Sequence, residues 1–370
     1  METVPVALGP RSYEVRVVSG EPAGFGPFAR ESLDRTWSGR PCRRALIVAD
    51  ANVGGLVDGI ARSLRAAGIE PTAATIPPGE ASKSLHVAGD LLGQLAAMKA
   101  DRHTAVVALG GGVVGDLAGF VAATYARGVP LLMVPTTLLA QVDSSVGGKV
   151  GVNLPAAKNI VGAFHQPAGV WIDTYTLHTL PIREIRCGYA EVVKYGFIMD
   201  AAFVDYLEEH AETLLKLDPG PTRGVVARCC RLKAGVVERD EREETGLRAV
   251  LNFGHTVGHA IEAVAGYGGA YRHGEAVAAG MVAECRLAER LGRVGPGVGD
   301  RLVALLARFG LPTSIEGLRA DDLIDAMRGD KKNAGGRTRF VLPRKVGHVE
   351  LTDEPTGDDV RAALSIVGAG

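Results

Sequence analysis

The chain has 370 residues, of which 46% are hydrophobic and 22% are charged, and its formal net charge is −1 at pH 7. This length is typical of two folded domains, while the near-zero charge without a basic stripe argues against nucleic acid or an anionic membrane as a partner. The chain shows no signal peptide and no apolar run long enough to span a membrane, and its five cysteines form no Cys-x-x-Cys pair, so we expect reduced thiols and a cytoplasmic protein.

The first half of the chain alternates strand patterns with helix patterns. Apolar strand patterns are predicted at residues 13–18, 44–48, 72–76, 105–109 and 131–134. Helical spacing is predicted between them, at residues 57–67, at about 84–98, and from near 115 to about 125. This alternation predicts a doubly wound, Rossmann-like α/β domain over residues 1–177.

A run of glycines ends the fourth of these strands. Gly110-Gly111-Gly112 follows it directly, and the next helix is expected to begin near Gly115. A strand, a glycine turn and a helix N-terminus form an anion site, because backbone N–H groups point outward and no Cβ atom keeps a pyrophosphate away. The spacing matches the dinucleotide fingerprint, but no acid follows about 20 residues later to hold a ribose. A tight turn that simply requires glycine explains the run equally well.

Polar residues also follow the next strand. It ends in Pro135-Thr136-Thr137, and residues 141–149 are glycine-rich, with Asp143 as an acid and Lys149 as a base. This stretch is predicted to be too irregular for a core element. Because ligands of open α/β sheets bind at the carboxyl ends of strands, two successive strands deliver candidate ligand-binding groups.

Earlier strands end in acidic residues as well. Asp50 follows the strand at 44–48, and Glu80 and Lys83 follow the strand at 72–76. A helix cap or a turn acid is the alternative interpretation of each carboxylate from its position alone.

The second half of the chain is dominated by helical patterns. They are predicted at residues 181–198, 201–217, 222–239, 256–265, 273–291, 300–309 and 320–328, with turns at 217–221 and 294–297. Two strand patterns, 339–342 and 349–351, form a candidate pair. We therefore predict a mainly helical domain over residues 178–370, with a ligand site in the cleft between the halves.

Histidines and acids with metal-ligand spacing lie in this second half. His255, His259 and Glu262 share one face of a predicted helix, His273 opens the next helix, and Glu191 lies on an earlier one. One carboxylate with two imidazoles suits zinc or cobalt and leaves positions open for a substrate. From spacing alone, a metal site and buried structural histidines are comparable interpretations, and His259 is not excluded as a ligand.

Cations gather around the same segments. Lys194 shares a helix face with Glu191, and Lys233, Arg248 and Asn252 precede the histidines. Surface lysines usually form only a solvated face. Because these residues precede the candidate metal ligands, we expect the fold to bring them inward, where they could bind an anionic ligand.

Six motifs, in this order, resemble the 3-dehydroquinate synthase family of sugar-phosphate cyclases, which is related in fold to metal-dependent polyol dehydrogenases. They are GGGVVGDLAGFVAATYARGV, VPTTLLAQVDSSVGGK, GYAEVVKYG, LNFGHTVGHAIE, HGEAV and GDKK. The resemblance extends from Arg11 to Lys332.

The resemblance implies a reaction. 3-Deoxy-D-arabino-heptulosonate 7-phosphate would be converted to 3-dehydroquinate and phosphate, a step of the shikimate pathway to chorismate and aromatic amino acids. The reaction would proceed in four steps: transient oxidation by NAD, β-elimination of phosphate, re-reduction and intramolecular aldol closure. NAD is not consumed, so the implied class is a carbon–oxygen lyase. Zinc or cobalt is the implied metal, and a cytoplasmic homodimer is the implied assembly.

By matched position, the resemblance also assigns site residues. The metal ligands would be Glu191, His255 and His273, which leaves His259 facing the substrate. Arg127 would reach the phosphate of a neighbouring subunit, and Lys331 would close over the phosphate. The full implied catalytic set is Arg127, Asp143, Lys149, Asn159, Lys194, Lys233, Arg248, Asn252, His259 and Lys331. The implied NAD-binding set is Asp50, Asn52, Glu80, Lys83, Gly111, Gly112, Val113, Gly115, Asp116, Thr136, Thr137, Asp143, Lys149, Lys158, Thr176 and Thr179.

Some positions depart from the family pattern, at Val150, Gly151, His165, Cys187 and Tyr189, and we expect them to affect fine geometry only. Three alternatives remain open. They are another sugar-phosphate cyclase, a polyol dehydrogenase with net NADH production, and a non-catalytic protein that senses NAD or metal. The clamp of cations favours a carboxylated sugar phosphate over the substrates of the other enzymes.

Overall fold

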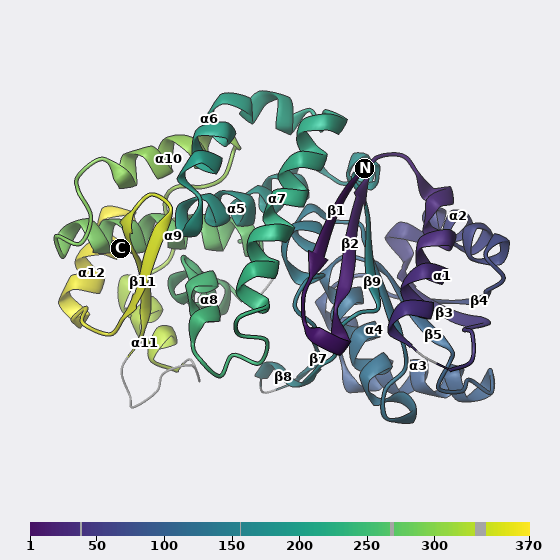
Figure 1. Ribbon diagram of the computed structural model, residues 1–370. Coiled ribbons are helices and arrows are strands. Elements are labelled where there is room, and N and C mark those ends of the chain that lie inside the picture. Colours follow the sequence, from purple (N-terminus) through teal and green to yellow (C-terminus); the bar gives the residue numbers. More distant parts are fainter. Residues whose placement is uncertain (38, 156, 267–269, 330–337) are drawn as a thin grey trace. The chain divides into compact units, whose positions relative to one another are not determined.

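The computed structural model describes residues 1–37, 39–155, 157–266, 270–329 and 338–370 (Figure 1). Contacts group the chain into two compact units. The first holds Met1–Leu180 and Thr222–Arg242, and the second holds Pro181–Pro221 and Glu243–Gly370. The domain boundary after residue 177 stays a prediction. Among the described residues, no helix has both the length and the hydropathy needed to cross a bilayer.

A seven-stranded sheet forms the centre of the first unit. Its order is β1-β2-β9-β6-β5-β3-β4, with β1 antiparallel to β2 and every other neighbouring pair parallel. The strands are β1 (Glu2–Val6), β2 (Tyr13–Val18), β3 (Arg44–Asp50), β4 (Glu70–Ile76), β5 (Ala105–Gly110), β6 (Leu131–Pro135) and β9 (Gly169–Asp173). Every residue of β5, β6 and β9 is buried, which accounts for their continuous apolar runs.

Helices bury this sheet on both faces. They are α1 (Phe25–Thr36), α2 (Gly54–Ala66), α3 (Leu85–Ala97) and α4 (Gly112–Thr124), and most of α7 (Pro219–Val237) also belongs to this unit. Phe28 of α1 and Leu64 of α2 pack in one core cluster with Ile47 and Val107 of the sheet. The alternating residue Leu46, which points to the other face, is also fully buried. The doubly wound prediction is confirmed.

Three predicted helix starts in this unit were wrong, since α2, α4 and α7 each begin three residues before the expected positions 57, 115 and 222. Helix α4 begins at Gly112, three residues before the expected start, because Gly111 already holds the extended N-cap conformation. Helix α7 begins at Pro219, inside a predicted turn. A proline suits the first helical position, since the N–H it lacks would have had no partner within the helix.

Residues 141–149 were predicted to be too irregular for a core element, and this prediction was wrong because the start of this stretch is buried in the core. Ala140–Ser144 forms a π-helix in which Gln141 is fully buried. The Gln141 amide donates to Pro135 O at 3.2 Å, Asp173 O at 3.3 Å and Thr176 Oγ1 at 3.2 Å. Because this donor group is satisfied, a polar side chain can occupy a core position.

The second unit is mainly helical, as predicted. Its helices are α5 (Ile182–Met199), α6 (Ala201–Leu215), α8 (His255–Val264), α9 (His273–Arg290), α10 (Val298–Arg308), α11 (Ala320–Gly329) and α12 (Gly357–Ile366). Strands β10 (Phe340–Lys345) and β11 (His348–Thr352) pair antiparallel, which confirms the predicted pair.

Glycines let three helices of this unit approach one another closely. A Cβ on Gly280 of α9 would lie 2.1 Å from Gly254 O, just before α8. A Cβ on Gly274, at the start of α9, would lie 2.1 Å from Cys187 O of α5. Any side chain at these positions would push the helices apart. The close packing places the first residues of α8 and α9 beside the middle of α5.

Candidate functional site

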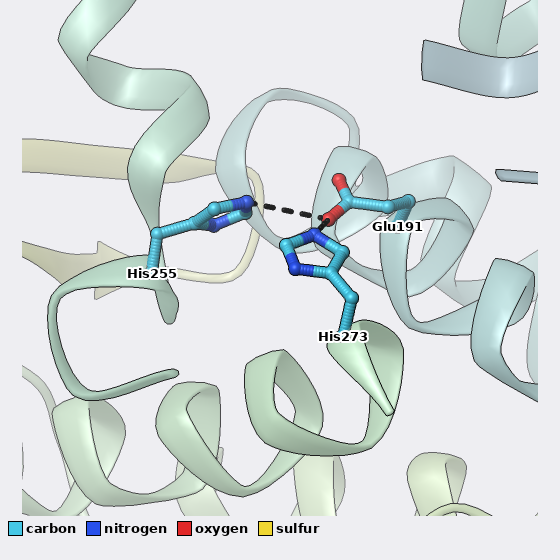
Figure 2. A group of neighbouring side chains, drawn as sticks. All are labelled: Glu191, His255 and His273. Carbon is cyan, nitrogen blue, oxygen red and sulfur yellow. Dashed lines mark ion pairs between the residues drawn. The ribbon is translucent and has the colours of Figure 1, made fainter. Parts of the chain in front are cut away.

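Three candidate metal ligands meet in the second unit. Glu191 of α5, His255 of α8 and His273 of α9 each offer a ligand atom, and these atoms all lie within 4.8 Å of one another (Figure 2). Glu191 Oε1 is 3.4 Å from His255 Nε2 and 3.7 Å from His273 Nε2. His259 is not in this group, and its ring centroid lies 5.4 Å from that of His255. Spacing alone did not separate the two histidines.

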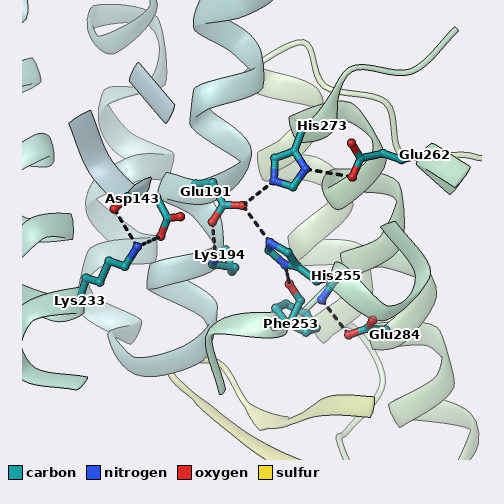
Figure 3. Close-up of polar contacts among 10 residues, drawn as sticks. Asp143, Glu191, Lys194, Lys233, Phe253, His255, Glu262, His273 and Glu284 are labelled. Carbon is teal, nitrogen blue, oxygen red and sulfur yellow. Dashed lines mark hydrogen bonds and ion pairs between the residues drawn. The ribbon is translucent and has the colours of Figure 1, made fainter. Parts of the chain in front are cut away.

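Each of the two histidines is held through its other ring nitrogen. His255 Nδ1 lies 3.2 Å from Phe253 O, and His273 Nδ1 lies 3.1 Å from Glu262 Oε2 (Figure 3). A carbonyl or carboxylate oxygen accepts, so Nδ1 is the donor in both contacts, and Nε2 is the nitrogen of each ring that faces Glu191. Metal-binding histidines are commonly oriented in this way. The donor set therefore fits zinc or cobalt.

Charge is concentrated around the buried Glu191 carboxylate. Lys194 forms an ion pair with it from three residues along α5, which confirms the predicted shared face. Burial and the Lys194 cation hold the pKa of His255 well below its usual value. Burial also lowers the pKa of His273, but contacts with Glu191 and Glu262 outweigh this effect and raise it to about 10. One carboxylate thus faces three groups that can carry positive charge.

A cavity of about 220 Å³ opens beside His255. Asn252, at the end of the 3₁₀ helix Leu247–Asn252, and His259 of α8 both line it, as does Glu243. The predicted clamp residue Arg248 is 4% exposed, and its Nε lies 3.6 Å from Glu243 Oε1. Of the predicted substrate residues, Asn252 and His259 thus line this cavity, Arg248 contacts the lining residue Glu243, and Lys331 lies outside the described residues.

Two further lining residues were missed by sequence reasoning. Thr256 lies between the two histidines of α8, and its hydroxyl donates to the Arg339 carbonyl at 3.0 Å. Arg339 also lines the cavity from just before β10. Their only sequence signal was position, since Thr256 belongs to the histidine motif and Arg339 starts a predicted strand.

The glycine turn of the first unit is closely covered by the segment after β6. A Cβ on Gly111 would lie 3.1 Å from Thr137 Cγ2, and one on Gly112 would lie 3.3 Å from Ser144 Oγ. Beside it, Thr136 Oγ1 is buried and has no hydrogen-bond partner within the described part of the chain. A buried hydroxyl without a partner calls for an explanation, and a bound polar ligand supplies one. The N-terminus of α4 favours an anionic ligand, such as a pyrophosphate.

A polar network joins other predicted NAD-binding residues. Lys83, which is 5% exposed, donates to Asp116 Oδ2 at 2.5 Å and to Asn159 Oδ1. Burial raises the pKa of Asp116, and the Lys83 cation opposes that rise. Glu80 Oε1 accepts from Asn153 Nδ2 at 2.7 Å. The network thus connects the loop after β4 with α4 and with the hairpin of β7 (Lys149–Leu154) and β8 (Ala157–Phe164).

The acid that follows β3 forms a local cap. Asp50 accepts from the Asn52 backbone N–H at 2.8 Å, which is the helix-cap geometry considered as the alternative interpretation. Its carboxylate has a structural partner, and its role toward NAD stays a prediction.

Lys233 is held against the π-helix. Its Nζ donates to Asp143 O at 2.7 Å and to Asp143 Oδ1 at 2.8 Å. Lys233 is 6% exposed, so the expectation that it points inward is confirmed.

The remaining predicted residues lie at element ends of the first unit. Lys149 and Lys158 are exposed on β7 and β8, and Arg127 is exposed in a left-handed turn with φ 66°. The rest are Val113 and Gly115 in the first turns of α4, and Thr176 and Thr179 in the 3₁₀ helix Thr174–Thr179.

Comparison with known proteins gives a consistent result. A family model described as 3-dehydroquinate synthase N-terminal matches residues 73–187, and one described as 3-dehydroquinate synthase C-terminal matches residues 188–333. The 3-dehydroquinate synthase of Desulforamulus reducens is 48% identical over 368 residues, which cover 99% of this chain and 100% of that protein. The 3-dehydroquinate synthase of Symbiobacterium thermophilum is 50% identical over 360 residues, covering 96% and 98%.

Solved structures show the same fold. A 2-epi-5-epi-valiolone synthase from Streptomyces hygroscopicus, with NAD+ and Zn2+ bound, matches with a TM-score of 0.87 at 29% identity and covers 98% of each chain. A 2-deoxy-scyllo-inosose synthase, complexed with carbaglucose-6-phosphate, NAD+ and Co2+, matches with a TM-score of 0.86 at 24% identity, covering 99% of this chain and 100% of that one.

Proposed function

This chain belongs to the 3-dehydroquinate synthase family, and we propose that it converts 3-deoxy-D-arabino-heptulosonate 7-phosphate to 3-dehydroquinate and phosphate. The observation that carries the proposal is the meeting of Glu191, His255 and His273 beside a cavity to which Asn252 and His259 contribute polar side chains. The reaction breaks a carbon–oxygen bond to phosphate, so the proposed class is a carbon–oxygen lyase acting on phosphates.

The proposal includes two bound groups. Glu191 and the Nε2 atoms of His255 and His273 would hold zinc or cobalt, and the glycine turn with Thr136 would hold the pyrophosphate of NAD. When bound, NAD supplies a reversible hydride acceptor, and the metal ion supplies a Lewis acid for a substrate oxygen. The related valiolone synthase, solved with NAD+ and Zn2+, supports this pair of groups.

The proposed work of the chain itself is to bind and orient a doubly anionic substrate. Lys194, Lys233 and Arg248 are all buried, and each faces a carboxylate, from Glu191, Asp143 and Glu243 respectively. An anionic substrate must therefore compete with these carboxylates for the cations. Arginine suits bidentate contact with a carboxylate or phosphate, and a lysine acts as a compact point charge. Asn252 and His259 would contact the substrate from the cavity wall.

We further propose a homodimer in the cytoplasm. Arg127 is exposed and lies on a turn in which the residue before it, Ala126, and the residue after it, Gly128, also have positive φ. The exposed side chain of Arg127 is accessible to a second subunit, as a residue that reaches a partner subunit's phosphate requires. Sedimentation or light scattering of the wild type and of Arg127→Ala, with turnover of each, tests this part.

The activity test incubates purified protein with the heptulosonate phosphate, a catalytic amount of NAD, and zinc or cobalt. Inorganic phosphate is measured, and the organic product is identified by its conversion with dehydroquinase. We expect phosphate and dehydroquinate in equal amounts, with no net NADH.

Other outcomes would contradict the proposal in distinct ways. Net NADH would indicate a polyol dehydrogenase. Bound metal and NAD without turnover of this substrate would indicate another cyclase or a sensing protein, and seven-carbon sugar phosphates that lack the carboxylate would then be tried. The 48% and 50% identities to 3-dehydroquinate synthases, against 29% to the valiolone synthase, favour the carboxylated substrate.

A further inference from the structure

A buried carboxyl group on α9 has no role in the site described so far. Glu284 is fully buried, and within the described part of the chain it forms no ion pair with a cation. Its Oε2 accepts the Gly254 N–H at 2.7 Å, and its Oε1 accepts the Val257 N–H at 3.4 Å. Burial raises its pKa to about 8, against the effect of these backbone donors. A buried acid is costly unless hydrogen bonds compensate it, so its placement at this point of the fold needs a reason.

The reason lies in the peptide group between Phe253 and Gly254. The N–H of this group belongs to Gly254 and donates to Glu284, while its C=O belongs to Phe253 and faces His255 Nδ1 at 3.2 Å (Figure 3). A peptide group is planar and rigid, so a constraint on its N–H also orients its C=O. Glu284 is therefore connected to the candidate metal ligand His255 through one rigid unit.

The backbone around this peptide is closely packed on α9. Gly254 has φ 79°, and a Cβ there would lie 2.4 Å from Met281 Cγ and 2.8 Å from Val277 O. The packing is equally close at Gly280, because a Cβ there would lie 2.1 Å from Gly254 O. Val277, Gly280, Met281 and Glu284 stand at positions i, i+3, i+4 and i+7, so one face of α9 carries the whole contact. The carboxylate contributes the hydrogen bonds on this face, and the glycines contribute the close approach.

We propose that Glu284 is a positioning residue of the metal site, which orients the Phe253–Gly254 peptide so that its carbonyl holds His255 with Nε2 toward Glu191. This inference rests on the proposed metal site. His273 is held by a direct carboxylate contact from Glu262, whereas His255 is held by a carboxylate that acts through a peptide group. The two histidines are thus oriented by two acids on different helices. Partners of this kind typically change metal affinity 10- to 100-fold when they are removed.

The test measures Co2+ affinity by titration of the metal-free protein, followed by the visible absorption of the bound cobalt. Glu284→Ala removes both acceptors, and Glu284→Gln keeps the shape and one oxygen acceptor. The matched control is Cys285→Ala, which alters another fully buried side chain of α9 that makes no described hydrogen bond to residues 253–257. Thermal unfolding of each metal-free variant measures how far it is destabilised.

We expect Glu284→Ala to bind Co2+ at least about tenfold more weakly and with a changed absorption spectrum. Glu284→Gln should lie between it and the wild type, and Cys285→Ala should match the wild type even if its unfolding temperature falls. Wild-type affinity in Glu284→Gln and in folded Glu284→Ala would overturn the inference, as would an equal loss in Cys285→Ala. If Glu284→Ala does not fold, Glu284→Gln decides. Failure of the wild type to bind Co2+ would instead contradict the metal site itself.

Discussion

His273 Nδ1 lies 3.1 Å from Glu262 Oε2, and the opposite nitrogen of the same ring faces Glu191. The contact crosses from α9 to α8, so the orientation of one candidate ligand depends on the helix that carries another. It also gives a role to Glu262, the acid on the histidine face of α8, which spacing along the helix alone does not define.

Replacing Glu262 should therefore weaken metal binding. We expect Glu262→Ala to lower Co2+ affinity about 10- to 100-fold, because the His273 ring loses the acceptor that fixes its tautomer. The measurement is a cobalt titration of metal-free protein. Glu209→Gln, a change at an exposed acid of α6, serves as the control and should bind as the wild type does. Unchanged affinity in Glu262→Ala would show that the ring is held by other contacts.

Lys149 tests the proposed reaction directly. It is exposed at the start of β7, so Lys149→Ala should leave the fold intact. If Lys149 contacts the substrate as proposed, turnover should fall at least about 100-fold, the usual effect of removing a catalytic proton-transfer or charge-stabilising group. Phosphate release gives the rate, and circular dichroism and thermal unfolding report the fold. Turnover equal to that of the wild type would refute its role.

Removing the Thr136 hydroxyl, which has no hydrogen-bond partner among the described residues, should affect protein stability and NAD binding in opposite directions. Thr136→Val keeps the shape and removes a buried polar atom that lacks a partner, so stability should stay equal or rise by about 1 kcal/mol. NAD binding should weaken if that hydroxyl contacts the cofactor. The measurements are chemical unfolding without NAD and titration with NAD.

A second threonine provides the matched comparison for stability. Thr174 is also buried, but its Oγ1 donates to Val18 O at 3.1 Å. Thr174→Val should therefore lose about 1 kcal/mol, since the Val18 carbonyl loses its side-chain donor. Equal destabilisation by both changes would mean that Thr136 has a partner after all.

The cysteines should be unreactive in the native protein. All five are buried, and burial raises the pKa of Cys187, Cys230 and Cys285 to about 12. Since the thiolate is the reactive form, a thiol reagent at pH 8 should label all five only after unfolding. As the pH rises, thiols in the unfolded chain ionise first, at about pH 8.5. The stability that the buried neutral thiols contribute is therefore complete below that pH and declines as the pH rises toward about 12. Rapid labelling of any thiol in the native protein would contradict this.

His165 should make the first unit sensitive to acid. Burial lowers the pKa of His165, although its contact with Val129 O at 2.9 Å opposes the shift. The unfolded histidine therefore binds a proton first, and the stability that the neutral ring contributes is complete above about pH 6.5 and is lost below it. The slope can reach about 1.4 kcal/mol per pH unit. Urea unfolding from pH 7.5 to 5 should show a steeper loss in the wild type than in His165→Phe.

The exposed His178 provides the control for that experiment. His178→Phe should keep the wild-type slope. If His165→Phe and the wild type lose stability in parallel, another group causes the acid sensitivity.

The fold class could be predicted because its signals are local. Apolar runs that alternate with helical spacing identified most strands and helices of the first unit, and the pairing of β10 with β11 followed from two short patterns. Elements without such a pattern were missed. Helix α1 contains Gly26, whose absent Cβ would lie 1.9 Å from Ser63 O, so a tertiary contact demands a residue that weakens the helical signal. Strand β8 is largely exposed and therefore shows no alternation of apolar and polar residues.

By itself, the sequence determined the doubly wound and helical halves, the family, and the residue types of the candidate site, because periodicity and motifs are written along the chain. Spacing left both His255 and His259 open as metal ligands, and the family resemblance implied His255, which the tertiary structure brings to Glu191 and His273. Only the tertiary structure decided that Glu262 and Glu284 orient the two rings. These choices depend on which side chains meet across α5, α8 and α9. That meeting is set by close contacts at Gly274 and Gly280, which spacing along one helix does not contain.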